Sequence, residues 1–443
     1  MHHEPDEAPP RAKDLRTAYR NCVAGPLRAD HPWYVDFGPA RGGSPVGRME
    51  RALEFKVPGV PGQPDTWSQG LLIGSRGSGK STELQRLAAQ VRHRYEVVLL
   101  EANTAMNLNQ FEPAELVLSI AVGVEQHMRV HEQKPLPAKH LEQLVDWFSK
   151  VTRFDLRSRV QEATVEGKLE GDWHVLGSVQ AMMRVQSELR QEVVSELQRY
   201  PRELVAQANT LLAAAAKQLG QDRELLVIVD NLDRYAPDVV HRSLCDGRDL
   251  LRDLDTNLLL TPPVSLAVNP IGEPLDQLYD PLIVMHTPTL RAPDDPPETV
   301  KDPGLDLFLK ALDKRLDRAA IFDQPADTVP HLLQLTGGSL RDLWEHLKQA
   351  TLVATGSRIT RADLDEALRL RRSMMRDQID VSGMAPLLVH IEKTGQLTDD
   401  PNAMVALYRR WVLKYNGTEW YALHPYVRGL PRIQSLLRHC DDR

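Results

Sequence analysis

Short apolar runs alternate with amphipathic stretches along residues 46–290. Five of these runs predict buried strands of a parallel sheet, because each is short, almost continuously apolar and bounded by turn residues. They lie at 71–73, 95–101, 224–230, 264–269 and 282–285. Residues 46–55, 82–91 and 112–130 instead space their apolar side chains along one face of a helix. Strands that alternate with helices favour an α/β fold built on a parallel sheet.

A long, mostly helical stretch at about 136–220 interrupts this alternation. Its clearest helices are predicted at 136–151 and 179–219, and the segment 162–171 between them is either a short hairpin or a loop. Because the stretch is much longer than the connection that joins two strands through a helix, we interpret it as an insertion. Its apolar face is expected to pack against the core; a partner-binding arm is the alternative.

Residues 304–373 contain no strand pattern and predict four helices, at 305–316, 328–335, 339–354 and 361–371. The first helix places its large apolar residues on one face, namely Leu305, Phe308, Leu309, Leu312 and Leu316. That spacing is typical of a helix in a small bundle. Residues 304–375 are therefore expected to form a separate all-helical domain.

The pattern changes again from about residue 383. Two helices, at 384–394 and 401–410, precede two strands at 412–415 and 420–423 around Asn416-Gly417, a dipeptide typical of a two-residue hairpin turn. A last helix is predicted at 427–438. Helix, helix, hairpin and helix in this order predict a winged-helix-like domain at 383–443. If such a domain bound DNA, Arg409, Arg410 and Lys414 would be the contacting cations.

Composition limits the class of protein only broadly. The 443 residues are too many for one hydrophobic core, and the net charge of −7 argues against indiscriminate coating of nucleic acid. Cys22, Cys245 and Cys440 lie too far apart in sequence for a metal-binding motif. There is no apolar run long enough to cross a bilayer and no signal-peptide core at the start, so we expect a cytoplasmic protein without a membrane contact.

The most informative segment follows the first predicted strand, where residues 74–81 read G-S-R-G-S-G-K-S. This matches the phosphate-binding P-loop in its strand-then-helix setting; an ordinary glycine-rich turn is the alternative. Lys80 would bind the β- and γ-phosphates, Ser81 would bind Mg²⁺, and the next helix would direct its positive end at the phosphates. The predicted nucleotide-binding residues are Gly74, Gly77, Gly79, Lys80, Ser81 and Thr82.

The lead-in before the P-loop is rich in Pro, Gly and aromatic residues. Residues 1–13 are expected to be disordered, with a short helix at about 15–23. Many P-loop proteins close over the adenine with such a segment, so Trp33, Tyr34, Val46 and Gly47 are candidates for the adenine pocket. Packing of these side chains against the core is the alternative. Residues 1–45 are accordingly predicted to be an N-terminal arm and residues 46–290 the core.

The predicted strand at 224–230 ends in a carboxylate, Asp230, and continues as N-L-D-R. Ligands bind at the carboxyl ends of strands in open α/β sheets. This is the Walker B position, where Asp230 would hold Mg²⁺ directly or through water. Two signatures in the expected order, the P-loop and this strand, make an ATP site with Mg²⁺ the leading interpretation.

The catalytic base is less clear, because Asn231 stands where many ATPases have a glutamate. An amide can orient water but cannot accept its proton. Asp233 is the alternative carboxylate, although it could instead cap the helix near Pro237 or pair with Arg234. Asn269, at the end of the predicted strand 264–269, is a candidate sensor of the γ-phosphate or of the attacking water. These residues favour slow hydrolysis of the β–γ phosphoanhydride.

Taken together, G-S-R-G-S-G-K-S-T, L-L-V-I-V-D-N-L-D-R and G-G-S-L-R-D-L at 337–343 resemble P-loop ATPases of the AAA+ and STAND kind, especially KAP-type NTPases. The resemblance covers about residues 46–428. It implies a P-loop NTPase core with a parallel sheet and a long helical insertion, then an all-α lid and a small winged-helix domain. It also implies that Arg341 reaches from the lid to the nucleotide. A surface pair of Arg341 with Asp342 is the alternative.

Two functions remain open at this point. The first is an ATPase switch whose nucleotide state controls its conformation or oligomerisation. The resemblance suggests bacterial signalling or anti-phage defence as its setting, with a homo-oligomer or a separately encoded effector protein as partner. The second is an origin-recognition-like, ATP-dependent DNA-binding protein that uses the winged helix.

Overall fold

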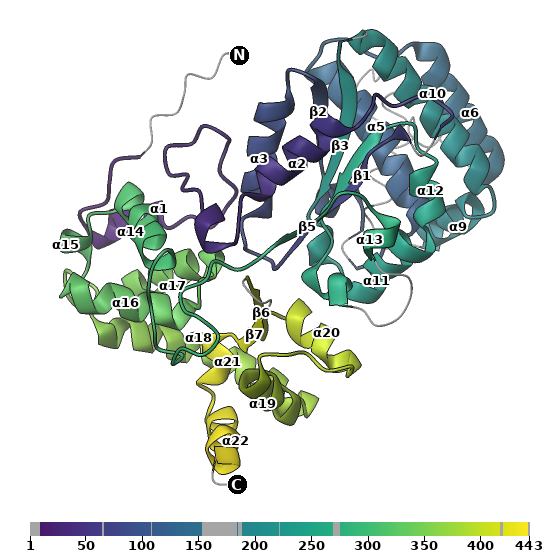
Figure 1. The fold of residues 1–443 in the computed structure, drawn as a ribbon. Helices are drawn as coiled ribbons and strands as arrows, with labels where there is room; N and C mark the ends of the chain where they lie inside the picture. The colour runs from purple at the N-terminus through teal and green to yellow at the C-terminus, as the bar shows by residue number, and fades with distance from the viewer. Residues whose placement is uncertain are drawn as a thin grey trace.

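The computed structural model describes residues 9–63, 66–107, 109–152, 184, 188–220, 222–268, 275–416 and 420–441. Figure 1 shows an α/β core, a group of lid helices drawn in green, and a C-terminal module drawn in yellow beneath both. The N-terminal arm runs along the lid and then crosses to the core. None of the described helices is long and apolar enough to span a membrane.

The core is built on a parallel sheet of five strands with the order β2-β3-β4-β1-β5. The strands are β1 (Gln69–Gly74), β2 (Tyr95–Glu101), β3 (Glu224–Asp230), β4 (Asn257–Leu260) and β5 (Leu282–Met285). The inner strands β1, β3 and β4 are almost wholly buried, since helices cover both faces of a parallel sheet. β4 separates the two strands that carry the motifs, and all strands end at the same edge.

Successive side chains of each strand contribute to opposite layers of the core. On one face, Leu72 and Ile228 pack with α2 (Pro45–Phe55) and α3 (Lys80–Val91). On the other face, Ile73 and Val229 pack with α5 (Pro113–Val130), α10 (Pro201–Leu219) and α12 (Arg248–Arg252). The alternation predicted from the apolar runs therefore places α3, with the P-loop at its start, against the centre of the sheet.

The predicted strand at 264–269 is wrong. Val264–Val268 is a short 3₁₀ helix, and the strand at this place in the sheet is β4, seven residues earlier. Pro262 and Pro263 lie between them, and proline cannot donate a backbone hydrogen bond to a neighbouring strand. The strand therefore ends before the two prolines, and the apolar residues after them turn into the core. The interval between β3 and β4 contains α11 (Pro237–His241), a π-helical turn at Arg242–Asp246 and α12.

The helical insertion packs against α5, as its apolar face predicted. Its described helices are α6 (Ala138–Thr152), α9 (Glu188–Leu197) and α10, and their apolar residues join the same core cluster as α5. Arg190 of α9 is buried and donates two hydrogen bonds, of 2.9 and 2.7 Å, to Glu115 of α5. The predicted hairpin or loop at 162–171 lies outside the described residues.

The lid consists of α14 (Gly304–Arg315), α15 (Arg318–Ile321), α16 (Pro325–Thr336), α17 (Leu340–Val353) and α18 (Arg361–Ser382). Phe308, Leu312 and Leu316 are fully buried in the lid core, in agreement with the predicted apolar face. α18 is eleven residues longer than the helix predicted at 361–371. The arm helix α1 (Leu15–Asn21) belongs to this part of the molecule, because its Asn21 amide donates to the Arg315 carbonyl oxygen at 2.8 Å.

The C-terminal module has the predicted order of helix, helix and two strands, given by α19 (Ala385–Thr394), α20 (Pro401–Tyr408), β6 (Val412–Tyr415) and β7 (Trp420–Leu423). The single helix predicted at 427–438 is instead two helices, α21 (Pro425–Arg428) and α22 (Pro431–Asp441). β6 and β7 pair antiparallel. The cations expected on a DNA-binding face make contacts within the chain. Arg410 donates to the buried carboxylate of Asp342, Arg409 donates to Gln378 at 3.2 Å, and Lys414 is buried.

Candidate functional site

The P-loop joins the end of β1 to the start of α3 at the carboxyl edge of the sheet. Gly77 and Gly79 have φ values of +82° and +100°, which lie in the region where only glycine is free of strain. These two residues let the loop curl around the N-terminus of α3, whose first backbone N–H groups have no partner within the helix. A cavity of about 270 Å³ opens at this point, between the core, the N-terminal arm and the lid.

Lys80 lies in the cavity wall and is buried. Its ammonium group donates to the backbone oxygens of Gly74 and Ser75, at 2.7 and 3.2 Å, and to the Asp233 carboxylate at 2.6 Å. Asp233 is itself buried, so the two charges compensate each other away from water. Neither alternative for Asp233 is observed, because the carboxylate caps no helix at Pro237 and forms no ion pair with Arg234 among the described residues.

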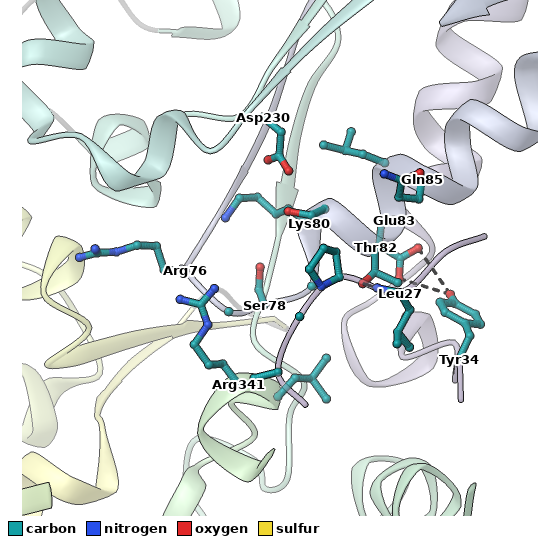
Figure 2. Close-up of a pocket in the computed structure, with 18 of the residues that line it drawn as sticks. Leu27, Tyr34, Arg76, Ser78, Lys80, Thr82, Glu83, Gln85, Asp230 and Arg341 are labelled. Carbon is teal, nitrogen blue, oxygen red and sulfur yellow. Dashed lines mark hydrogen bonds between the residues drawn. The ribbon is translucent and has the colours of Figure 1, made fainter. Parts of the chain in front are cut away.

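Asp230 ends β3 beside Lys80, as the motif predicted, and is 8% exposed. Its Oδ1 accepts hydrogen bonds from the Asn231 backbone N–H at 2.7 Å and from the Thr261 hydroxyl at 2.9 Å. Asn231 is left-handed, with φ of +68°, and lines the same cavity. Ser81, in the first turn of α3, also lines it. Figure 2 shows the Asp230 carboxylate beside Lys80 at the end of the strand.

Thr261 is a site residue that sequence reasoning missed. It follows β4 directly and holds the Asp230 carboxylate, so it occupies the strand-end position that the prediction gave to Asn269. The short apolar run N-L-L-L before T-P-P was the available signal. Asn269 itself lies outside the described residues.

Arg341 enters the cavity from the lid. It lies in the first turn of α17, and Figure 2 shows its guanidinium directed at Ser78 of the P-loop. Its backbone N–H donates to the Gly77 carbonyl oxygen at 3.3 Å, so the lid helix touches the loop. Among the described residues its guanidinium has no hydrogen bond or ion pair. Burial, and then the nearby Arg410, lower the pKa of Arg341.

The predicted alternative for Arg341, a surface pair with Asp342, does not form. Asp342 is 1% exposed and accepts from Arg410 and, at 3.0 Å, from His424 of the C-terminal module. Although burial opposes the charge, Arg410 and His424 hold the pKa of Asp342 well below its usual value. Arg341 is therefore left facing the cavity.

The other end of the cavity is made by the arm and the lid. The Arg315 guanidinium lies over the rings of Trp33 of the arm and Trp344 of α17, with its carbon 4.6 and 3.9 Å from the two ring centroids. Tyr34 donates to Glu83 of α3 at 3.3 Å. Of the four adenine-pocket candidates, Trp33 and Tyr34 line the cavity, whereas Val46 is buried beside α3 and neither it nor Gly47 is part of the lining.

Several buried polar atoms along this cavity lack a partner in the described part of the chain. They are Trp33 Nε1, Arg41 Nε, Arg76 Nε, Ser78 Oγ and Arg315 Nε. Buried polar groups are nearly always hydrogen-bonded, and four of these five atoms can only donate. The lining therefore fits a ligand that carries many acceptor oxygens and negative charge, as a nucleotide does.

The residues present also fit Mg²⁺. Mg²⁺ takes oxygen ligands, keeps several waters, and is usually bound by one or two protein groups together with phosphates of the substrate. Asp230 and Ser81 supply such oxygens beside the P-loop. No group of three or more His, Cys, Asp or Glu side chains suited to a metal occurs among the described residues.

No protein-family model matches the sequence, and no curated protein matches it. The solved structures that are similar over most of their length include the following three. The Walker-type ATPase PABY2304 of Pyrococcus abyssi has 13% identity and a TM-score of 0.47, with 94% of this chain and 99% of that chain covered. Cdc6p from Pyrobaculum aerophilum has 12% identity and a TM-score of 0.37, covering 89% and 94%. The Orc1 protein of Aeropyrum pernix, solved in complex with DNA, has 13% identity and a TM-score of 0.36, covering 89% and 93%. With TM-scores below 0.5, these similarities assign no function to this chain, and its α/β P-loop fold is established by its own sheet and loop.

Proposed function

We propose that this protein is an ATPase switch that binds ATP with Mg²⁺ and hydrolyses it slowly. One observation carries the proposal. Lys80 of the P-loop, Asp230 of β3 and Arg341 of the lid, which come from three distant parts of the sequence, line one cavity whose unpartnered polar atoms are mostly donors.

Binding begins with the exchange of one partner of Lys80. The ammonium group that is held by Asp233 turns to the β- and γ-phosphates, while Gly74, Gly77, Gly79 and Thr82 keep the loop and the first turn of α3 in place. Ser81 and Asp230 would hold the metal, and Thr261 fixes the orientation of the Asp230 carboxylate. When bound, Mg²⁺ neutralises charge on the β- and γ-phosphate oxygens.

The release of Lys80 changes Asp233. Without its ion pair, the Asp233 carboxylate is a buried anion close to the phosphate end of the cavity, and it can accept a proton from an attacking water. Asn231 can orient that water through its amide but cannot take the proton. This division of roles between an amide and a more distant carboxylate supports slow turnover of the β–γ phosphoanhydride.

The switch lies in the contact of the lid with the P-loop. Arg341 makes a charge-assisted bond only when a phosphate oxygen is present. A γ-phosphate therefore stabilises the lid in its position against the core, relative to an open position, by the free energy of this one bond. Asp342, the next residue, holds Arg410 and His424, so the C-terminal module moves with α17. A homo-oligomer or a separate effector protein is the proposed reader of this movement, in bacterial signalling or anti-phage defence.

The second candidate is an ATP-dependent DNA-binding protein of the origin-recognition type. The helix, helix, hairpin and helix order of the C-terminal module supports it. The contacts of Arg409 and Arg410 within the chain weigh against it, because a DNA-binding face needs cations that can reach phosphates.

The experiment combines calorimetry with ATP and Mg²⁺, a phosphate-release assay, and size-exclusion chromatography with and without duplex DNA. Binding and slow hydrolysis, with a size or shape change that does not need DNA, are expected. The absence of any binding heat for ATP and GTP with folded protein would remove the proposal. Nanomolar, salt-dependent DNA binding would replace the switch by the second candidate.

A further inference from the structure

Arg41 is an arginine with an unusual position. It belongs to the N-terminal arm, between the 3₁₀ turn at Gly38–Ala40 and α2, and lies outside every motif found in the sequence. Its residue surface is only 5% exposed. Arginine is almost never so deeply buried unless its charge has partners, so the contacts of this side chain need an explanation.

The main contact is with the tip of the P-loop. Arg41 Nη2 donates a hydrogen bond to the backbone oxygen of Ser78. The 78–79 peptide is trans, so the carbonyl of Ser78 and the N–H of Gly79 point in opposite directions. A donor that holds this carbonyl therefore also fixes the direction of the Gly79 N–H, at the residue that caps the N-terminus of α3.

Other groups keep the Arg41 guanidinium in place. Glu83, which is buried in the first turn of α3, has its carboxylate 3.9 Å from Nη1. The ring of Phe37 lies beneath the guanidinium at 5.7 Å, and Tyr34 donates to Glu83. Burial lowers the pKa of Arg41 to about 10, while Glu83 opposes this change, so the group keeps its charge at neutral pH.

We propose that Arg41 is a positioning residue for the phosphate-binding loop. It holds the Ser78 carbonyl oxygen out of the cradle and thereby keeps the Gly79 N–H available to a phosphate. Through Arg41 the N-terminal arm sets the shape of the P-loop, in addition to closing one side of the cavity. This inference rests on the proposed function, because it concerns the affinity of the same site for phosphates.

The test compares Arg41→Met and Arg41→Lys with Arg51→Met. Arg51 is the matched control, because it is an exposed arginine of α2 whose Nε also donates to one backbone oxygen, that of Gly47, at 3.1 Å. ATP, ADP and adenosine are titrated into each protein and followed by tryptophan fluorescence, with Trp33 and Trp344 as reporters at the other end of the cavity. The melting temperature without ligand is measured in parallel.

Arg41→Met is expected to lose about tenfold to a hundredfold in affinity for ATP and ADP, the size expected when a hydrogen bond of a charged group is lost. Its affinity for adenosine should stay within about twofold. Arg41→Lys, which keeps the charge but not the planar fork, should lose less, and it serves as the test if Arg41→Met does not fold. The control should match the wild type.

Three outcomes would overturn the inference. Equal losses for ATP and adenosine would mean that Arg41 only supports the arm. Unchanged ATP affinity in both Arg41 variants, with the wild type binding normally, would mean that the contact with Ser78 has no effect on the loop. Failure of the wild type itself to bind ATP would instead remove the proposed function, and this inference with it.

Discussion

The two ends of the proposed nucleotide cavity are built in different ways. The phosphate end consists of a loop between β1 and α3 and a carboxylate at the tip of β3, and its geometry is set largely by backbone within the motifs. The arm-and-lid end is made by Trp33, Arg315 and Trp344, which are brought together by contacts between residues almost 300 positions apart. Each part of the phosphate end takes its shape from one short motif, whereas the arm-and-lid end exists only when the lid and the arm have packed together.

This difference assigns separate tasks to the two ends. The phosphate end offers backbone donors, one ammonium group and two carboxylates, which suit charge and metal. The arm-and-lid end offers aromatic surface and a stacked guanidinium, which suit a planar ring. Affinity for phosphate and affinity for a base should therefore be separable by mutation.

The largest effect is expected from Lys80→Ala. Removal of the ammonium group leaves Asp233 buried without its partner and takes away the P-loop cation that is proposed to bind the phosphates. Affinity for both ATP and inorganic tripolyphosphate should fall by about a hundredfold or more. Calorimetry with the two ligands measures this, and full retention of ATP affinity would show that the phosphate end has been misassigned.

Asp230→Asn should separate hydrolysis from binding. The amide keeps the shape of the side chain and can still meet Thr261, but it no longer attracts a divalent cation. We expect Mg²⁺-dependent phosphate release to fall by about a hundredfold, while ATP affinity without Mg²⁺ changes by less than about threefold. Thr261→Val should give a smaller loss in the same direction. Equal losses in binding and turnover would contradict the role given to Asp230.

Acid should destabilise the folded protein through a buried histidine of the lid. His346 of α17 is fully buried, and its ring nitrogens contact the Tyr426 hydroxyl and the Leu364 carbonyl oxygen at 3.1 and 3.0 Å. Burial lowers the pKa of His346 from 6.5 to about 4, so below pH 6.5 the unfolded chain binds a proton that the folded chain does not. The free energy of unfolding should therefore fall as the pH is lowered from 6.5 toward 4, with about 2 kcal/mol lost by pH 5.

Urea unfolding at pH 8 and pH 5 measures this loss. His346→Gln removes the titrating group and should show a smaller difference between the two pH values. His93→Gln, at an exposed position, is the control and should behave like the wild type. An identical pH difference in all three proteins would exclude His346 as the cause.

Trp344→Leu tests the arm-and-lid end in isolation. Leucine keeps the position apolar but removes the ring that stacks on Arg315, so ATP affinity should fall by about fivefold to tenfold. Affinity for tripolyphosphate, which has no base, should not change. If both ligands lose affinity equally, the two ends of the cavity are not separate.

The smallest effect is expected from Asp233→Asn. The amide no longer forms an ion pair with Lys80, so the ammonium group is more readily available and ATP affinity should rise by about threefold. Turnover should fall at the same time, because the amide cannot accept a proton. Stronger binding without loss of turnover would remove Asp233 as the base and leave it only as the partner of Lys80.

The sequence could predict those features that depend on a short local segment. The P-loop, Asp230 and the apolar face of α14 were accessible because each depends on spacing within a short segment. β4 was not, because four residues before two prolines carry too little pattern, and Thr261 was lost with it. The stack of Trp33, Arg315 and Trp344 and the ion pair of Lys80 with Asp233 depend on tertiary contacts that no local pattern encodes. Arg341 could be proposed only through the resemblance of G-G-S-L-R-D-L to a lid motif.

The close approach of Gly77 to the lid has a consequence for variation at this position. A β-carbon built on Gly77 would lie 2.5 Å from the β-carbon of Arg341, well inside the distance at which two carbon atoms repel. Even Gly77→Ala would therefore push α17 outward, although Gly77 is one of the variable letters of the P-loop signature. In this chain the glycine at a variable position of the signature sets how near the lid helix can come to the P-loop.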